Sequence, residues 1–258
     1  MTQEVPQTRL IGRLDIKGEH VVKGIHLEGL RKVGQPTELA RRYYEAGIDE
    51  LIYMDIVASL YQRNNIFSVV SAAASEIFVP LTVGGGIRSI DDIVVALRHG
   101  ADKVAINTAA TADPDFIDCA ASTVGSQAIV ISIEAKSREN EHWEVLTDNG
   151  RERTGRDAVE WAREVEKRGA GEILLTSVDY EGTAKGMDLG LIKAVRSEVK
   201  IPVVASGGVG NLDHINQVLD PLGAGGADGI ALAHVLHYEH ATVDELKRGI
   251  RAAGYPVR

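Results

Sequence analysis

A strand that runs straight into a cluster of glycines occurs twice in this chain. Residues 80–87 are Pro-Leu-Thr-Val-Gly-Gly-Gly-Ile, and residues 202–209 are Pro-Val-Val-Ala-Ser-Gly-Gly-Val. Each copy is followed by a Gly-Ala-Asp triplet and another apolar strand, at residues 100–107 and 226–233. Because glycine has no Cβ, backbone N–H groups at the start of the next helix can approach an anion closely. The repeat therefore predicts a duplicated chain with two phosphate sites, and a substrate with a phosphate at each end.

Eight apolar strands alternate with helices along the chain, and acidic or glycine-rich clusters follow the strands. This order predicts an α/β fold, a (β/α)8 TIM barrel with its active site at the C-terminal ends of the strands. A doubly wound open sheet is the alternative, but its glycine fingerprint follows the first strand, whereas here the glycine turns follow the third and seventh. We expect residues 1–258 to form a single domain built from two fused half-barrels, approximately residues 1–125 and 126–258.

Several local features carry definite structural predictions. Residues 17–34 are expected to form a long loop containing glycines, and Thr37 is expected to cap the next helix. Residues 59–65 are expected to form a polar loop. Asp148-Asn149-Gly150 predicts a tight turn between two short strands, because Asn-Gly is a strong hairpin sequence. Cys119 lies in a predicted helix and is expected to be buried.

Composition excludes several classes of function. The net charge is −9 and the chain has no long run of Lys and Arg, so neither a nucleic-acid groove nor a membrane surface is expected. The single cysteine fits a reducing cytoplasmic environment, and no apolar run is long enough to predict a membrane span. The eight histidines have no metal-ligand spacing, so neither a metal nor another cofactor is expected.

Two acidic residues follow strands at equivalent places in the two halves. Asp15 and Glu134 each precede a lysine by two positions, and the repeat places them on opposite sides of one barrel opening. Two carboxylates beside a doubly phosphorylated ligand can act as general acid and general base. In the alternative interpretation, each carboxylate is only ion-paired with a neighbouring lysine.

The glycine turns are each expected to have a second side. We define the first cradle as residues 84–87 with Asn107 and Thr108, and the second cradle as residues 206–209 with Ala233 and His234. His234 could contact phosphate as a cation, or it could be an exposed loop histidine; the sequence leaves both open.

Four charged residues begin strands at the opposite end of the predicted barrel. Two are cations and two are carboxylates, so they are expected to meet in salt bridges that close the barrel floor: Arg9, Glu50, Lys103 and Glu172. The pattern favours a structural plug, although a gate is the functional alternative.

Several blocks of the sequence resemble the cyclase subunit of imidazole glycerol phosphate synthase, the HisF family. The blocks are residues 14–17, 21–24, 49–51, 55–56, 82–87, 100–104, 106–109, 166–176 and 206–208. The resemblance implies a (β/α)8 barrel that forms a heterodimer with a glutaminase subunit. It also implies that ammonia from that partner crosses the barrel to a bisphosphate substrate at its mouth. The expected reaction converts a phosphoribulosyl-formimino aminoimidazole carboxamide ribonucleotide into imidazole glycerol phosphate and aminoimidazole carboxamide ribonucleotide.

The resemblance also implies roles for individual residues. Asp15 matches a catalytic acid or base, and Asp102 matches a position that faces the glutaminase. The four floor residues match a gate on the ammonia route. Together with the cradles, the expected substrate-binding positions are Lys23, Asp55, Gly85, Gly86, Asn107, Thr108, Thr176, Glu181, Gly182, Ser206, Gly207, Gly208 and His234.

Four residues depart from the family pattern. Glu134 and Glu181 stand where the family has aspartates, His234 replaces a serine, and Arg13 replaces a small uncharged residue beneath Asp15. One additional methylene moves a carboxyl group by roughly 1 Å, and displacement on that scale can cost about a hundredfold in rate. This distribution favours a changed substrate over random drift.

Three functions therefore stay open on the sequence. The chain could be the histidine-pathway cyclase, or a paralogue that supplies ammonia for an acetamidino group on a surface sugar. In the third interpretation it is a barrel that docks and activates a glutaminase without chemistry of its own. All three predict the same partner, so only turnover separates them.

Overall fold

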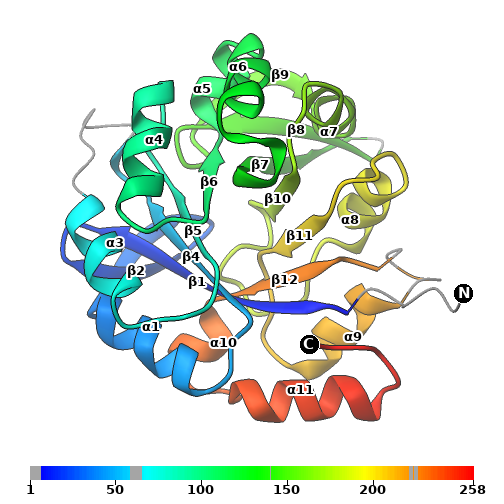
Figure 1. Ribbon diagram of the computed structural model, residues 1–258. Coiled ribbons are helices and arrows are strands. Elements are labelled where there is room, and N and C mark those ends of the chain that lie inside the picture. Colours follow the sequence, from blue (N-terminus) through cyan, green and yellow to red (C-terminus); the bar gives the residue numbers. More distant parts are fainter. Residues whose placement is uncertain (1–6, 59–65, 140, 221–222, 224–225) are drawn as a thin grey trace, which may run out of the picture.

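A closed parallel barrel forms the centre of the molecule (Figure 1). The computed structural model describes residues 7–58, 66–139, 141–220, 223 and 226–258. Within these residues the eight barrel strands are β1 (Arg9–Lys17), β4 (Glu50–Asp55), β5 (Leu81–Gly84), β6 (Lys103–Ile106), β7 (Ile129–Arg138), β10 (Glu172–Ser177), β11 (Val203–Ser206) and β12 (Gly229–Leu232). The barrel closes where β1 pairs in parallel with β12. This confirms the predicted (β/α)8 architecture. The expected polar loop at residues 59–65 lies outside the described residues.

Helices surround the strands and bury one face each (Figure 1). They are α1 (Pro36–Glu45), α3 (Phe67–Ala74), α4 (Ile90–Arg98), α5 (Thr108–Ala112), α6 (Asp115–Val124), the short 3-10 helix η1 (Ser126–Ala128), α7 (Ala158–Lys167), α8 (Leu189–Arg196), α9 (Leu212–Leu219), α10 (His234–His237) and α11 (Val243–Ala252). Capping boxes start α4 at Ser89 and α11 at Thr242. No helix in the described ranges is long and apolar enough to cross a membrane.

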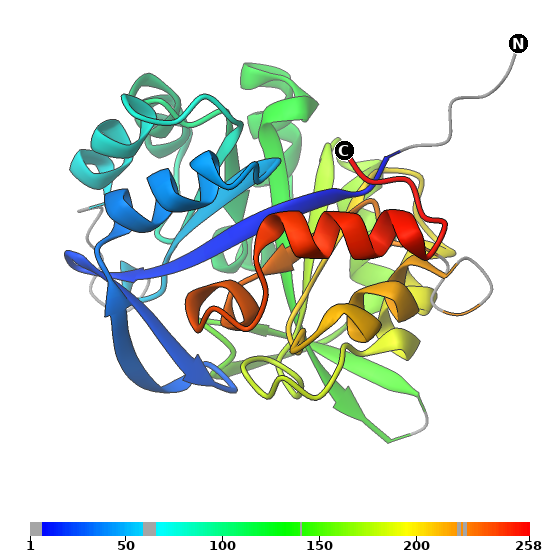
Figure 2. The same cartoon turned by 90° about the horizontal axis from the view of Figure 1, so that it is seen from below.

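Two antiparallel hairpins extend from the end of the barrel at which the parallel strands finish. The C-terminus of the chain lies at the other end (Figure 2). Strands β8 (His142–Thr147) and β9 (Glu152–Asp157) confirm the predicted turn, in which Asp148 and Asn149 both have positive φ. Strands β2 (His20–Ile25) and β3 (Glu28–Gly34) occupy the segment predicted as a loop, so that prediction is wrong. Strand β3 is polar and mostly exposed, and irregular register interrupts its pairing with β2, which hides the alternation typical of a strand.

Two smaller predictions are also wrong. Gln35 rather than Thr37 is the N-cap of α1, because Pro36 occupies the first helical turn, where a missing N–H costs nothing. Cys119 is exposed. Helix α6 turns Ile117 and Ala120 toward the core, and a residue between these positions lies on the opposite side of the helix.

The barrel interior has an apolar waist between two polar ends. The waist side chains form a cluster separate from the core beneath the helices: Ile11, Ile52, Ala105, Val130, Leu174, Val204 and Ala231. Strand alternation places charged residues below this layer and polar residues above it. The C-terminal strand ends, which we call the mouth, therefore carry the candidate chemistry.

Aspartate side chains accept hydrogen bonds from backbone N–H groups at the N-terminal ends of two barrel strands, β5 and β11. Asp102 accepts a hydrogen bond from the Leu81 backbone N–H at 2.8 Å, and Asp228 accepts one from the Val203 N–H at 2.9 Å. Each aspartate comes from the Gly-Ala-Asp triplet that follows a cradle. We propose that residues 1–125 and 126–258 are fused half-barrels of one domain, and this repeated contact supports the proposal.

Replacing either aspartate with alanine should destabilise the barrel. Asp102→Ala and Asp228→Ala each leave a strand-starting N–H without its acceptor, which costs about 1–3 kcal/mol. Urea unfolding measures the loss. Glu45→Ala, which removes an exposed pair with Arg41 at the end of α1, is the control and should change stability by less than about 0.5 kcal/mol. Equal effects of all three substitutions would contradict this role.

Candidate active site

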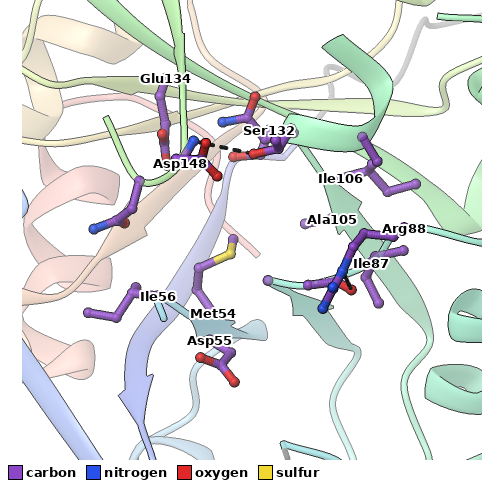
Figure 3. Close-up of a pocket in the computed structure, with 16 residues that line it drawn as sticks. Met54, Asp55, Ile56, Ile87, Arg88, Ala105, Ile106, Ser132, Glu134 and Asp148 are labelled. Atoms are coloured by element: carbon purple, nitrogen blue, oxygen red, sulfur yellow. Dashed lines mark hydrogen bonds between the residues drawn. The ribbon is translucent and has the colours of Figure 1, made fainter. Parts of the chain in front are cut away.

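The first cradle opens onto a cavity at the mouth, about 150 Å³ in volume. Its lining combines backbone from the glycine turn with polar side chains from neighbouring strand ends (Figure 3). The lining residues expected from the sequence are Asp55, Gly85, Gly86, Asn107, Thr108 and Glu134. These residues come from β4, β5, β6 and β7 and the loops after them, so a ligand here would contact four consecutive barrel strands.

Glycine is required in the first cradle by close backbone packing. Gly85 has φ +90°, and a Cβ at this position would lie 2.1 Å from the Asp55 carbonyl oxygen. The Asp55 carboxylate accepts a hydrogen bond from the Val57 N–H at 3.0 Å, and burial raises the pKa of Asp55 above its ordinary value. The turn is thus held against the end of β4, and its surface toward the cavity stays free of side chains.

The β8–β9 turn covers one side of this cavity. The Asn107 amide donates to the Leu146 carbonyl oxygen at 3.2 Å, and the Asp148 N–H donates to the Thr108 hydroxyl at 3.3 Å. Asn107 and Thr108 therefore position the turn as well as lining the cradle. Asp148 and Asn149 enter the cavity wall through these contacts.

The second cradle is almost closed, with a free volume of about 10 Å³. Its lining includes the expected Gly182, Ser206, Gly207, Gly208 and His234. Arg13, Lys23 and Glu181 occupy the space beside the glycine turn. Lys23 and Glu181 form a buried ion pair across the mouth, from β2 to the loop after β10.

Arg13 crosses the upper barrel interior and contacts three strands. Its Nε atom donates to an Asp15 carboxylate oxygen at 2.9 Å, and one terminal nitrogen donates to the hydroxyls of Thr176 and Ser206 at 3.0 and 3.1 Å. Lys23 lies 3.8 Å from the other Asp15 oxygen. Burial alone would raise the pKa of Asp15, but the charges of Arg13 and Lys23 outweigh it and hold that pKa below its ordinary value. Asp15 is therefore an ionised carboxylate at neutral pH.

Glu134 is the second buried carboxylate, and its surroundings are different. Its carboxylate accepts a hydrogen bond from the Gly150 N–H at 2.7 Å. Burial raises the pKa of Glu134 to about 7, although Arg13 and this hydrogen bond oppose the rise. Two carboxylates with oppositely displaced pKa values are suited to act as base and acid. The lysine pairing considered from the sequence holds in part for Asp15, which pairs with Lys23 rather than Lys17 and also with Arg13. Among the described contacts Glu134 has no lysine partner.

The floor residues do meet, as the sequence predicted. Arg9 contacts Glu50 at 2.8 Å and Glu172 at 2.5 Å, and Lys103 contacts the same two carboxylates at 3.1 and 2.8 Å. A Cβ at Gly229 would lie 3.1 Å from Ile11 and 3.2 Å from Val204, so the glycine leaves room for these two side chains above the ring. The four side chains form a closed ring of alternating charge across the floor.

His234 lies at the rim of the second cradle rather than free in solvent. It stacks on His240 at 5.2 Å between ring centroids and contacts Tyr238 at 4.7 Å. Burial lowers the pKa of His234, and His240 and Lys23 lower it further. A neutral imidazole is therefore expected at pH 7, which favours a hydrogen-bonding role over a fixed cationic one.

Several lining residues were not among those expected from the sequence. Arg88, Ser132, Asp148 and Asn149 join the first-cradle cavity, and Figure 3 shows Glu134 and Asp148 across it from Arg88. Ser132 could have been found by strand alternation, because it precedes Glu134 by two positions. The position of Arg88 depends on the path of the chain after the glycine turn, which the pattern does not give. The described residues contain no group of acidic, histidine or cysteine side chains that could hold a metal ion.

Comparisons with known proteins agree with this geometry. Residues 9–242 match the model of a family described as histidine biosynthesis protein. A curated relative from Legionella pneumophila, named imidazole glycerol phosphate synthase subunit HisF, is 63% identical over 208 residues. The aligned region covers 81% of this chain and 98% of the relative.

Replacing Glu134 with glutamine should stabilise the protein at pH 8 but not at pH 5. The folded-state pKa of about 7 lies above the ordinary 4.5, so the folded protein keeps a proton that the unfolded chain releases. The free energy of unfolding therefore falls as pH rises between these values. Glutamine still accepts from Gly150 and carries no charge, so Glu134→Gln should recover on the order of 2–3 kcal/mol at pH 8.

Urea unfolding at both pH values measures this difference. Glu239→Gln, which removes an exposed carboxylate paired with Arg42, is the control and should show no pH-dependent gain. If Glu134→Gln and the wild type lost stability equally between pH 5 and pH 8, the proposed protonation of Glu134 would be excluded.

Proposed function

The chain belongs to the histidine biosynthesis protein family, and on this premise we propose that it is the cyclase subunit of imidazole glycerol phosphate synthase. The reaction uses ammonia to convert a phosphoribulosyl-formimino aminoimidazole carboxamide ribonucleotide into imidazole glycerol phosphate and aminoimidazole carboxamide ribonucleotide. The observation that carries the proposal is the arrangement of the mouth. Glu134 lines the cavity of the first cradle, and Asp15 contacts Arg13 and Lys23, which line the second, so the two ends of the mouth carry carboxylates of different pKa.

The two carboxylates suit the proton transfers that this chemistry needs. When ammonia adds to a carbonyl carbon, the nitrogen loses protons and the carbonyl oxygen leaves as water. Asp15, held ionised by Arg13 and Lys23, is suited to accept a proton. Glu134, with its pKa raised to about 7, is suited to donate one. Because the groups differ in environment, one site can supply both steps at neutral pH.

The cradles are proposed to hold the two phosphates of the substrate. Gly85, Gly86, Asn107 and Thr108 would bind one at the open cavity. The second phosphate would bind at Gly207 and Gly208, together with Ser206, His234, Gly182 and Thr176, where Arg13 and Lys23 supply positive charge. Asp55 and Glu181 complete the set of proposed substrate-side residues.

The floor ring is proposed to be the entry point for ammonia. Arg9, Glu50, Lys103 and Glu172 close the end of the barrel opposite the mouth. The apolar waist above them suits neutral ammonia, since carrying ammonium through it would require desolvating a charge. One side chain of the ring would have to move for each passage, and Lys103 is the most exposed of the four.

The ammonia source is proposed to be a glutaminase subunit docked on the floor, in a heterodimer located in the cytoplasm. The word "subunit" in the name of the relative supports an assembly. Asp102 lies exposed at this same end and precedes Lys103 of the ring, which supports a position at the interface. No cofactor is required by the proposed reaction.

Turnover of the phosphoribulosyl-formimino substrate with ammonium chloride tests the activity without the partner. We expect wild-type turnover, and a loss of at least about 100-fold in kcat for Asp15→Asn and for Glu134→Gln, as for removal of a general acid or base. Asp179→Asn is the control, because Asp179 lies on the same rim but binds the Ser137 N–H. An inactive wild type would refute the cyclase proposal and favour the acetamidino-sugar paralogue or the non-catalytic docking barrel.

The interface role of Asp102 can be separated from its contact with Leu81. Asp102→Ala should weaken glutaminase binding by at least about tenfold, the scale of one well-placed interface contact. Asp228→Ala is the control. It removes the equivalent strand-end contact in the other half, together with the pair between Asp228 and Arg196, and should leave binding near the wild-type value. Calorimetric titration measures both, and equal weakening would assign the effect to barrel stability instead.

A further inference from the structure

The two cradles are unequal, although the sequence repeat predicts equivalent sites. The first opens onto about 150 Å³, whereas the second has about 10 Å³. A single water molecule needs roughly 10–15 Å³ of such space. A phosphate group therefore fits the first cradle as it stands and cannot enter the second until a side chain moves.

The carboxylate of Glu181 fills the second cradle. The side chain is buried, and one of its oxygens lies 3.3 Å from the position that a Cβ of Gly207 would take. The other oxygen accepts from the Lys23 ammonium. A negatively charged group thus lies beside the glycine turn and is paired with a lysine.

Backbone contacts hold Glu181 in this position. Its carbonyl oxygen accepts from the His26 N–H at 2.8 Å, and a His26 ring nitrogen lies 3.0 Å from the Val178 carbonyl oxygen. Gly182 packs so closely against the hairpin that a Cβ would lie 2.2 Å from the Gly24 carbonyl oxygen. Rotation of the Glu181 side chain can therefore empty the cradle while these backbone contacts remain.

Charge balance makes such an exchange necessary. Arg13 and Lys23 face Asp15 and Glu181, so the buried cluster holds two cations and two carboxylates. Adding a phosphate to this cluster would leave buried negative charge without a partner, which is strongly unfavourable. An incoming anion must take Lys23 from Glu181.

We propose that Glu181 is an internal anion that occupies the second cradle, and that an anionic substrate group binds there only by displacing it. Glu181 then sets the specificity of this end of the site. A free anion competes poorly with a carboxylate that is part of the chain, whereas a ligand already held at the first cradle competes well. Only the identity of the incoming group, a phosphate of a diphosphorylated substrate, rests on the proposed function. The closed cradle itself is a property of the resting protein.

Titration with inorganic phosphate at constant ionic strength tests the proposal, with backbone amide NMR signals reporting each cradle separately. In the wild type, Gly85 and Gly86 should respond at phosphate concentrations at least about tenfold lower than Gly207 and Gly208. In Glu181→Gln, which keeps the shape but loses the charge, Gly207 and Gly208 should bind at least about tenfold more tightly, since one close like charge is removed. Gly85 and Gly86 should be unchanged.

Asp179→Asn, which removes one negative charge from the same loop, is the matched control and should behave as the wild type. If Glu181→Gln did not fold, Glu181→Ser would remove both charge and volume, and the wild-type difference between cradles needs no variant. Equal responses of both cradles in the wild type, or no gain at Gly207 and Gly208 in the variant, would overturn the proposal. Ammonium-dependent turnover of the wild type is a separate measurement, so failure of this proposal can be distinguished from failure of the proposed function.

Discussion

Pairing of buried charge inside the barrel is the constraint on which the rest of the structure depends. The floor ring contains two cations and two carboxylates, and so does the cluster at the mouth, which consists of Arg13, Lys23, Asp15 and Glu181. An apolar waist separates them. Ions in such surroundings are tolerated only when paired. Glu134 belongs to neither cluster and instead accepts from a backbone N–H. Burial raises its pKa, so this carboxylate is suited to donate a proton.

The same constraint links the two ends of the barrel to the proposed passage of ammonia. A ring that is electrically balanced can open by moving one side chain while the remaining three keep partial pairing. A neutral molecule can then cross the waist, whereas an ion would meet no compensating charge there. The proposed reaction therefore needs no continuous polar channel. It needs a charged floor that excludes ions and an apolar layer that does not retain ammonia by hydrogen bonds.

The sequence predicted features that local chemistry dictates and missed those that depend on distant pairing. The glycine turns and the Asp148-Asn149-Gly150 hairpin follow from backbone geometry, and the floor ring follows from strand position. The β2–β3 hairpin was missed because β3 is polar and exposed, so burial does not impose an alternating pattern on it. The closed second cradle depends on Lys23 and Glu181, which are 158 positions apart. No local pattern in the sequence indicates that contact, so the two similar glycine turns predict two equivalent cradles.

Three of the four departures from the HisF pattern have a common explanation in three dimensions. Arg13, Glu181 and His234 all line the second cradle. With a small uncharged residue at position 13, Lys23 would face two carboxylates, and the cluster would carry an unpaired negative charge. Arg13 supplies the missing positive charge and is held by Thr176 and Ser206, whose short side chains leave space for it. The arginine thus helps to fill the cradle in the resting protein, and it remains there to bind the anion once Glu181 moves away. A site of this kind is closed without substrate but keeps its full positive charge for the substrate.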